Sequence, residues 1–330
     1  MHSLWLYLLC LTLGTTISKM TGLVKVAVIS QVGDDQLSYL FNDPSSLYTW
    51  IDGSTVDFIQ MGGTMPIIVK LGTPLDEVKD ILDEVDAIVL PSGTIASENS
   101  ALYQKYVRFI VNYAIKKNLA IQANPNAPPM PVLAYGTSLI PFLLSFADEL
   151  NKKPPVIDCT MKDTNTTHSM VTNSAAIYQN ALFQQLGRFT KCASESSMYF
   201  NHGCGVEVNA MKDLRDEIGI LATYVLSGKT YAGVLVHKSM PFTAVQFDPS
   251  KTTYTRTINR NQDVVSQECA RFVSQLAIQW LDSVRSTAKP IKDSSTSIRK
   301  LFMQLDNPWI VATNGTERVY SYKTYSLPFN

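Results

Sequence analysis

Short apolar runs rich in β-branched residues recur along the first half of the chain. They are Val24–Ile29, Pro66–Lys70, Asp86–Pro91 and Pro131–Tyr135. These runs lack the alternation of apolar and polar positions that marks a half-exposed strand. They therefore predict short strands that are buried on both faces, as in the parallel sheet of an α/β protein.

The segments between these runs have helical spacing. Apolar residues recur at three- and four-residue intervals from Leu75 to Val85, and Thr73-Pro74 predicts an N-cap followed by proline at the first helical position. Another helical pattern ends at Gly62-Gly63, and a third covers about residues 102–117. Strand and helix alternate with short connections, which predicts an α/β fold with a parallel-rich central sheet flanked by helices.

The second half of the chain is less regular. Residues 231–237 (YAGVLVH) and 242–247 (FTAVQF) predict a further pair of strands, and residues 264–284 predict a long amphipathic helix. The chain shows no internal repeat and no sharp change of composition at which it could be divided. We therefore expect a single domain over residues 19–330.

The composition is that of an ordinary globular protein of 330 residues, with 45% hydrophobic and 17% charged residues. Lys plus Arg equals Asp plus Glu at 28 each, and the sequence has no basic stripe with interleaved aromatic residues. Such stripes are what the phosphates of nucleic acids attract. Nucleic acid is therefore not an expected partner.

The first residues predict an export signal. The apolar block from Leu4 to Leu13 is shorter than the roughly 20 residues that a transmembrane helix needs. Small polar residues follow, with Thr16 and Ser18 at a spacing suited to cleavage. We expect residues 1–18 to be a signal peptide and the chain to have no transmembrane span. The alternatives are an uncleaved anchor and a buried N-terminal strand.

Export would place the cysteines in an oxidising compartment. Cys10 leaves with the signal peptide, and the remaining ones are Cys159, Cys192, Cys204 and Cys269. One or two disulfides are expected, with three pairings open. The sequence has no Cys-x-x-Cys pair, so no metal site is expected. Glycosylation sequons at Asn165 and Asn314 suit the same compartment.

Gly136-Thr137-Ser138 joins the predicted strand at 131–135 to an apolar helical segment. A sharp strand-to-helix turn of this kind carries the nucleophile in many hydrolases. The alternative is an ordinary N-cap, because Ser138 precedes apolar residues and Pro141 lies in the first turn. The residues themselves leave both roles open.

Six segments follow one another in a specific order. They are VKVAVISQ, STVDFIQMGGTMPIIV, DAIVLPSG, PVLAYGTSLIPF, FTAVQFDPSK and NGTERVYSYKTYSLPF. Together they resemble γ-glutamyl hydrolase, of the class I glutamine-amidotransferase-like group, over nearly the whole mature chain. The resemblance implies a flavodoxin-like three-layer fold and no cofactor. The activity it implies is removal of γ-linked glutamates from folylpolyglutamates in lysosomes, vacuoles or outside the cell.

The resemblance also assigns positions in the site. The family's nucleophilic cysteine, in a Gly-Thr-Cys-Leu-Gly turn, falls on Ser138. Its His-Pro-Glu triplet, which supplies the base and an orienting carboxylate, places the histidine on Asp248 and the glutamate on Ser250. All three positions are thus substituted. Gly93 and Leu139 fall where an oxyanion would be bound, and His202 falls in a histidine-bearing segment near the site.

These substitutions weaken the chemistry. A serine hydroxyl ionises less readily than a thiol and depends on a well-placed base. Asp248 is a poor base, because an unperturbed carboxylate is roughly 2.6 pKa units less basic than imidazole, near 3.5 kcal/mol of proton affinity. Ile140 replaces the second glycine of the family's turn, and Ser92 replaces the first glycine of its Pro-Gly-Gly turn. The β-branched Ile140 in place of a glycine predicts an altered turn after Ser138.

Two functions follow from these observations. The first is a secreted or lysosomal or vacuolar pseudoenzyme that binds a γ-glutamyl or folate-like small molecule or serves as a glycoprotein scaffold. The second is an active γ-glutamyl hydrolase in which Ser138 attacks and His202 or His168 is the base. The non-catalytic interpretations are that Asp248-Pro249 opens a turn and that His202 is a satisfied structural residue. A homodimer is compatible with either function.

Overall fold

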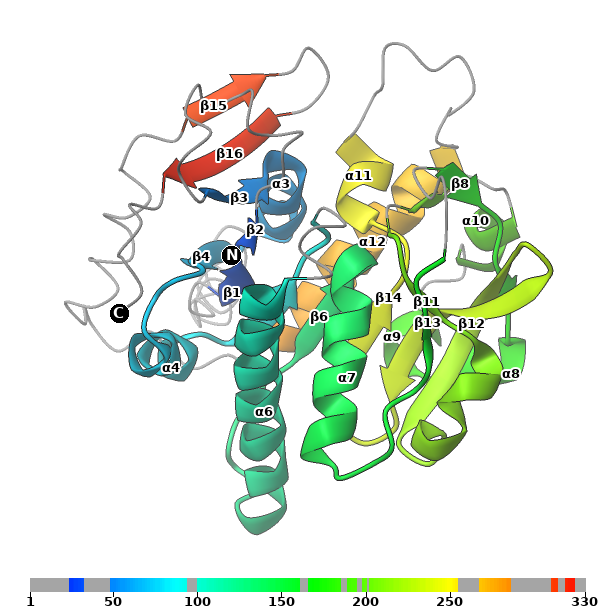
Figure 1. The fold of residues 1–330 in the computed structure, drawn as a ribbon, viewed down its shortest axis with the longest axis horizontal. Coiled ribbons are helices and arrows are strands. Elements are labelled where there is room, and N and C mark those ends of the chain that lie inside the picture. Colours follow the sequence, from blue (N-terminus) through cyan, green and yellow to red (C-terminus); the bar gives the residue numbers. More distant parts are fainter. Residues whose placement is uncertain are drawn as a thin grey trace, which may run out of the picture.

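The computed structural model describes residues 24–32, 48–93, 100–160, 166–184, 189–194, 198–200, 202–254, 267–285, 310–313 and 318–323. An eight-stranded sheet in the order β4-β1-β5-β6-β14-β13-β12-β9 forms its centre (Figure 1). The first five strands are parallel: β4 (Met65–Val69), β1 (Lys25–Ile29), β5 (Ala87–Leu90), β6 (Val132–Tyr135) and β14 (Phe242–Val245). The last three pair in antiparallel fashion: β13 (Lys229–His237), β12 (Ile218–Leu226) and β9 (Val171–Thr172).

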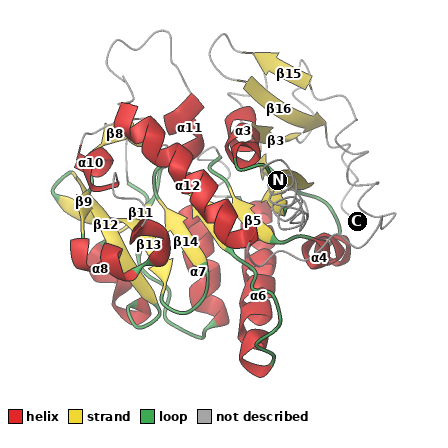
Figure 2. Cartoon of the chain, turned by 180° about the vertical axis from the view of Figure 1, so that it is seen from behind, coloured by secondary structure: helices red, strands yellow, loops and turns green. Residues whose placement is uncertain are grey.

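Alternate residues of the sheet pack on its two faces. In β1, Val26 and Val28 belong to one apolar cluster, and Ala27 and Ile29 belong to another. The first face is covered by α3 (Gly53–Met61) and α12 (Gln267–Arg285). The second is covered by α4 (Leu75–Glu84), α6 (Ala101–Ala123) and α7 (Leu139–Glu149), as Figures 1 and 2 show from opposite sides. The predicted α/β class, with a parallel-rich sheet flanked by helices, is confirmed.

The four apolar runs of the first half are strands whose ends lie within one residue of those predicted. Three details of the prediction were wrong. Thr73 does not cap α4, because Pro74 is the N-cap and the backbone amide of Thr73 donates to the carbonyl of Lys70. Helix α6 continues beyond residue 117 to Ala123. Strand β12 was missed, since its mixture of buried and half-exposed positions in an antiparallel pair has no single period.

Smaller elements surround the main sheet. Strands β2 (Gln31–Val32), β3 (Tyr48–Asp52), β15 (Ile310–Thr313) and β16 (Arg318–Lys323) form a four-stranded sheet, and β7 (Ile157–Asp158) pairs with β11 (Gly205–Val206), as β8 (Thr166–His168) does with β10 (Met198–Phe200). The short helices are η1 (Gly136–Ser138), α8 (Ser174–Gln179), α9 (Ala181–Gln184), α10 (Phe189–Ser194), η2 (Val208–Leu214) and α11 (Pro249–Tyr254). The antiparallel pairing of β3 with β16 brings the C-terminal hairpin beside the strand that leads into α3 (Figure 1).

The structure selects one of the three cysteine pairings. Cys159 is bonded to Cys204, and Cys192 is bonded to Cys269. Within the described part of the chain, no helix has the length and apolar character needed to cross a membrane. The predicted signal peptide over residues 1–18 and the sequons at Asn165 and Asn314 lie outside the described residues.

Candidate functional site

The positions assigned from the resemblance meet at one edge of the sheet. Gly93 follows β5, Ser138 follows β6 and Asp248 follows β14, and these three strands are neighbours and parallel. The carboxyl ends of parallel strands form the usual ligand-binding edge of an open α/β sheet. A hydrogen bond of 3.2 Å from the Gln246 side chain to the carbonyl of Gly136 ties the last two segments together.

In the turn before α7, the residue with an unusual backbone conformation is Gly136 and not Ser138. Gly136 has φ of +58°, in the left-handed region that suits a residue without Cβ. Ser138 has φ −79° and ψ −13°, which is ordinary right-handed helical backbone. Its side chain makes no capping hydrogen bond to α7. Ser138 thus occupies the N-cap position of α7, as one interpretation expected, but its hydroxyl does not cap the helix because its partners lie elsewhere.

The Ser138 hydroxyl is the middle of a buried chain of hydrogen bonds. It donates its proton to the carbonyl of Pro91, and its oxygen lies 2.5 Å from the Tyr103 hydroxyl. The Gln31 amide donates at 2.9 Å to both the Tyr103 hydroxyl and the Pro91 carbonyl. Since Ser138 has one proton and gives it to Pro91, Tyr103 is the donor in their shared bond. Ser138, Tyr103 and Gln31 are each 0% exposed.

The two predicted oxyanion donors are already engaged. The amide of Gly93 donates to the Thr137 hydroxyl at 2.7 Å, and the amide of Leu139 donates to the carbonyl of Gly136. A Cβ at Gly93 would lie 2.2 Å from the Gln31 side chain, so no larger residue fits there without movement. An oxyanion would have to displace these internal hydrogen bonds before either amide could stabilise it.

Asp248 and Ser250 form the start of a helix. The Asp248 Oδ1 accepts from the Ser250 hydroxyl at 2.6 Å and from the amide of Lys251 at 3.0 Å. Pro249 follows as the first residue of α11, which is the position that proline favours. The expectation that Asp248-Pro249 merely opens a turn is corrected, because Asp248 caps the amino end of α11.

The Asp248 cap continues into a buried charged cluster that the sequence analysis did not find. The Ser250 hydroxyl lies 3.1 Å from the Ser54 hydroxyl, and Ser54 donates its amide and hydroxyl to Asp52 Oδ1 at 2.9 and 2.8 Å. Lys251 Nζ lies 3.5 Å from the other oxygen of Asp52. Asp52 and Lys251 are only 5% and 8% exposed. We call Asp52, Ser54, Asp248, Ser250 and Lys251 the buried polar cluster. It joins α3 to α11.

Burial raises the pKa of Asp248, and the Asp52 carboxylate acts in the same direction, while Lys251 and the hydrogen bonds from Ser250 and the Lys251 amide oppose it. The folded-state pKa thus lies above that of the unfolded chain. The contribution of Asp248 to the free energy of unfolding is therefore complete at pH values below its pKa in the unfolded chain. It is lost as the pH rises through its pKa in the folded protein.

We therefore expect natural protein to lose stability relative to Asp248→Asn as the pH rises. Urea unfolding of both proteins between about pH 3.5 and about pH 7 measures this difference. The exposed Asp216→Asn is the matched control, because it leaves the buried polar cluster intact. A stability difference that grows in favour of natural protein with rising pH would contradict the prediction.

His202 lies in an aromatic environment. It is 0% exposed, its Nε2 is 2.8 Å from the Tyr224 hydroxyl, and its ring lies near those of Phe200 and Tyr224. Among the described residues the hydrogen-bond partners of Ser138 Oγ are Tyr103 and Pro91, so the geometry does not place His202 as its base. The side chain of His168, the other predicted base, lies outside the described residues.

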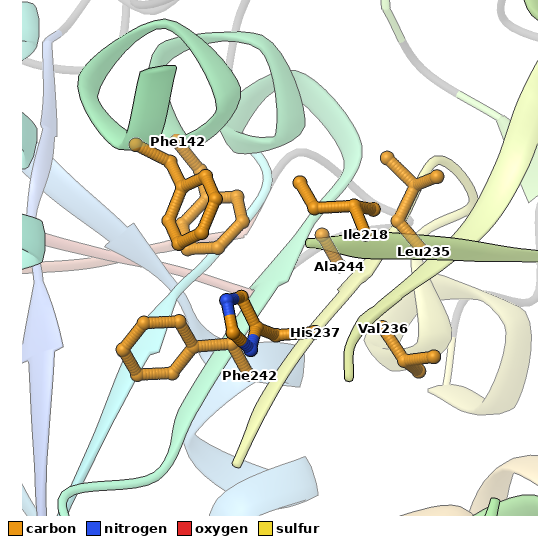
Figure 3. Close-up of a pocket in the computed structure, with 8 residues that line it drawn as sticks. Phe142, Ile218, Leu235, Val236, His237, Phe242 and Ala244 are labelled. Carbon is orange, nitrogen blue, oxygen red and sulfur yellow. The ribbon is translucent and has the colours of Figure 1, made fainter. Parts of the chain in front are cut away.

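His237 lies at the opposite end of the sheet from Asp248. It ends β13 beside the first residue of β14, whereas Asp248 follows the last residue of β14. Its Nδ1 accepts from the amides of Ser239 and Met240 at 3.0 and 2.8 Å. Burial lowers its pKa, with Glu217 opposing that shift. Its ring lies among apolar side chains (Figure 3). The cavity that they line has a volume of about 10 Å³, which holds at most about one water.

The comparisons with known proteins bear only on the fold. No protein-family model and no curated protein matches the sequence. The chain is similar in structure to a protein of Thermoplasma acidophilum that is provisionally assigned as a GMP synthase subunit. The two share 14% identity with a TM-score of 0.46, over 79% of this chain and 97% of that one. The α/β architecture is defined by the strand order and pairing of the central sheet.

The site offers few groups for chemistry. Within the described residues, no group of three or more His, Cys, Asp or Glu side chains is placed to hold a metal ion. Its polar groups are already paired within the protein. The Ser138 hydroxyl and the amides of Gly93 and Leu139 donate to internal acceptors, and the Asp248 carboxylate caps a helix. Gln31 and Tyr103, which hold Ser138, were also missed by the sequence analysis, because nothing local in the sequence links them to it.

Proposed function

We propose that the protein is a non-catalytic relative of the γ-glutamyl hydrolases in which the former active-site positions have become part of the core. The observation that supports this most strongly is the Ser138 hydroxyl, which donates to the carbonyl of Pro91. A serine attacks a carbonyl only when a base takes its proton. A peptide carbonyl is not such a base, so this hydrogen bond holds the hydroxyl in an unreactive state.

The burial of the site supports the same proposal. Ser138 and Ser250 are 0% exposed and Asp248 is 1% exposed. A substrate could reach these atoms only after Tyr103 and the polar partners of Asp248 had moved. Their hydrogen bonds would then be lost in the interior, where unpaired polar groups are costly. The burial of Ser138, Asp248 and Ser250 therefore argues against the binding of a γ-glutamyl or folate-like ligand to these residues. It favours a scaffold role over a ligand-binding one.

We further propose that the protein is secreted or lysosomal or vacuolar. Two disulfides link the described residues, and disulfides persist mainly in oxidising compartments. The predicted signal peptide points to the same location. In this setting the chain would act through its surface as a disulfide-bonded scaffold.

Hydrolysis of a γ-linked diglutamyl folate tests the proposal. We expect natural protein and Ser138→Ala to show the same background rate, because the hydroxyl takes no part in chemistry. The control is Ser145→Ala, which removes another buried serine hydroxyl, one that donates to the carbonyl of Pro141 within α7. Turnover that is lost in Ser138→Ala and kept in Ser145→Ala would refute the proposal, since removing a working serine costs about a millionfold.

A further inference from the structure

The two disulfides differ in their exposure to solvent. Cys192 and Cys269 are each 0% exposed and lie in the apolar cluster that also contains Phe189 and Phe272. Cys159 is an exposed residue, and its partner Cys204 is 2% exposed. Thiol–disulfide exchange needs direct approach of a thiolate to a sulfur atom. Only the Cys159 end of the two bonds lies at the surface.

The Cys159–Cys204 disulfide closes a short piece of sheet. It joins the residue after β7 to the residue before β11, and these strands pair only through Asp158 with Gly205 and Ile157 with Val206. Outside this ladder, Asp158 Oδ2 receives hydrogen bonds from Lys229 Nζ at 2.6 Å and from the Tyr231 hydroxyl at 2.8 Å. Strand β7 is therefore held by the disulfide, by these polar contacts and by the packing of the half-buried Ile157 on the core.

The negative charge beside Cys159 is partly neutralised. Lys229 Nζ lies 2.6 Å from Asp158 Oδ2 and 3.0 Å from Glu207 Oε1. The Lys229 ammonium thus offsets part of the negative charge that the two carboxylates would present to a thiolate. Like-charge repulsion at this surface is accordingly reduced.

We propose that Cys159–Cys204 is a reversible exchange site for soluble dithiols, whereas Cys192–Cys269 is inert in the folded protein. A thiolate of the dithiol attacks Sγ of Cys159, the bond to Cys204 breaks, and Cys204 leaves as a thiolate that takes a proton from water. The second thiolate of the dithiol then attacks the first sulfur of the same dithiol, which is bonded to Cys159 in the mixed disulfide. Cys159 leaves as a thiolate that takes a proton from water. The protein gains two electrons and two protons, and the dithiol becomes a cyclic disulfide.

Reduction would leave β7 held by its two residue pairs with β11, by the side chain of Asp158 and by the packing of Ile157 on the core. The structure thus assigns a redox-dependent attachment to the segment that ends in β7. This proposal does not depend on whether Ser138 is catalytic, because Cys159 is exposed and takes no part in the buried hydrogen bonds of Ser138.

Timed alkylation of folded natural protein in dithiothreitol tests the proposal, with each cysteine followed by peptide mass spectrometry. We expect Cys159 and Cys204 to be labelled at least about 100-fold faster than Cys192 and Cys269, because the buried pair reacts only through rare opening of the core. Amide hydrogen exchange at Asp158 and Gly205 should rise together with that labelling. Equal labelling rates, faster labelling of the buried pair, or resistance of both pairs would each overturn the proposal.

Two double variants serve as matched controls. Cys159→Ser with Cys204→Ser should lack the fast phase, and Cys192→Ser with Cys269→Ser should retain it. The experiment on natural protein decides the question by itself if either variant fails to fold. If the fast phase of labelling persisted in the first variant, it would come from a bond other than Cys159–Cys204, and this would contradict the proposal.

Discussion

Replacing Asp52 with alanine is expected to lower the free energy of unfolding by about 3–5 kcal/mol. Asp52 caps α3 through the amide of Ser54 and lies 3.5 Å from the Lys251 ammonium, which is 8% exposed. The substitution removes the cap and the carboxylate that lies 3.5 Å from the buried Lys251 ammonium. Urea unfolding of natural protein and variant, with slopes compared to confirm two-state behaviour, gives the loss.

Two further variants separate the causes of that loss. Asp52→Asn keeps an oxygen for the cap and removes only the charge, so it should recover the capping part, about 1 kcal/mol. Lys251→Met in the Asp52→Ala background removes the buried cation and should recover part of the remainder. If Asp52→Ala costs less than about 1 kcal/mol, the buried polar cluster does not contribute as argued.

Replacing Gly136 with alanine is expected to cost about 2–5 kcal/mol. The backbone at Gly136 has φ of +58°, which alone penalises a residue with Cβ. The new Cβ would also lie 2.2 Å from Ser92 Oγ and 2.5 Å from Ser92 Cβ, so the turn before Ser138 would have to shift. Thermal and urea unfolding measure the cost.

Gly72→Ala is the matched control for the backbone penalty. Gly72 also has positive φ, of +92°, but nothing lies within 4 Å of its Cβ position. It should therefore show only the conformational cost, about 1–2 kcal/mol. Adding Ser92→Gly to Gly136→Ala should recover the steric part of the loss. Equal costs for the two glycines, or no recovery on removing the Ser92 side chain, would show that the contact does not matter.

The strands and most helices of the first half could be predicted because their signals are local. Val24–Ile29 and Pro131–Tyr135 are apolar runs of strand length, and the helical spacing after Pro74 is visible over three turns. Strand β12 could not be predicted in this way, since antiparallel pairing exposes some of its residues and buries others without a clean alternation. Its place is decided by pairing with β13 and β9.

The role of the candidate site residues stays a prediction, and the structure shows only where they lie. The order of β5, β6 and β14 brings Gly93, Ser138 and Asp248 to one sheet edge. Their side-chain partners come from distant parts of the chain. Tyr103 is 35 residues from Ser138, and Ser54 is 196 residues from Ser250. No local pattern encodes contacts at such separations.

The sequence alone determined the α/β class and the positions of the buried strands of the first half. These features follow from residue identity and from the spacing of apolar side chains, which can be read from short stretches of the sequence. The tertiary structure decided the cysteine pairing, the burial of Ser138 and the conversion of Asp248 from a candidate base into a helix cap. The physical reason is that hydrogen bonds and burial depend on which distant residues the fold brings together, and only packing of the whole chain sets that.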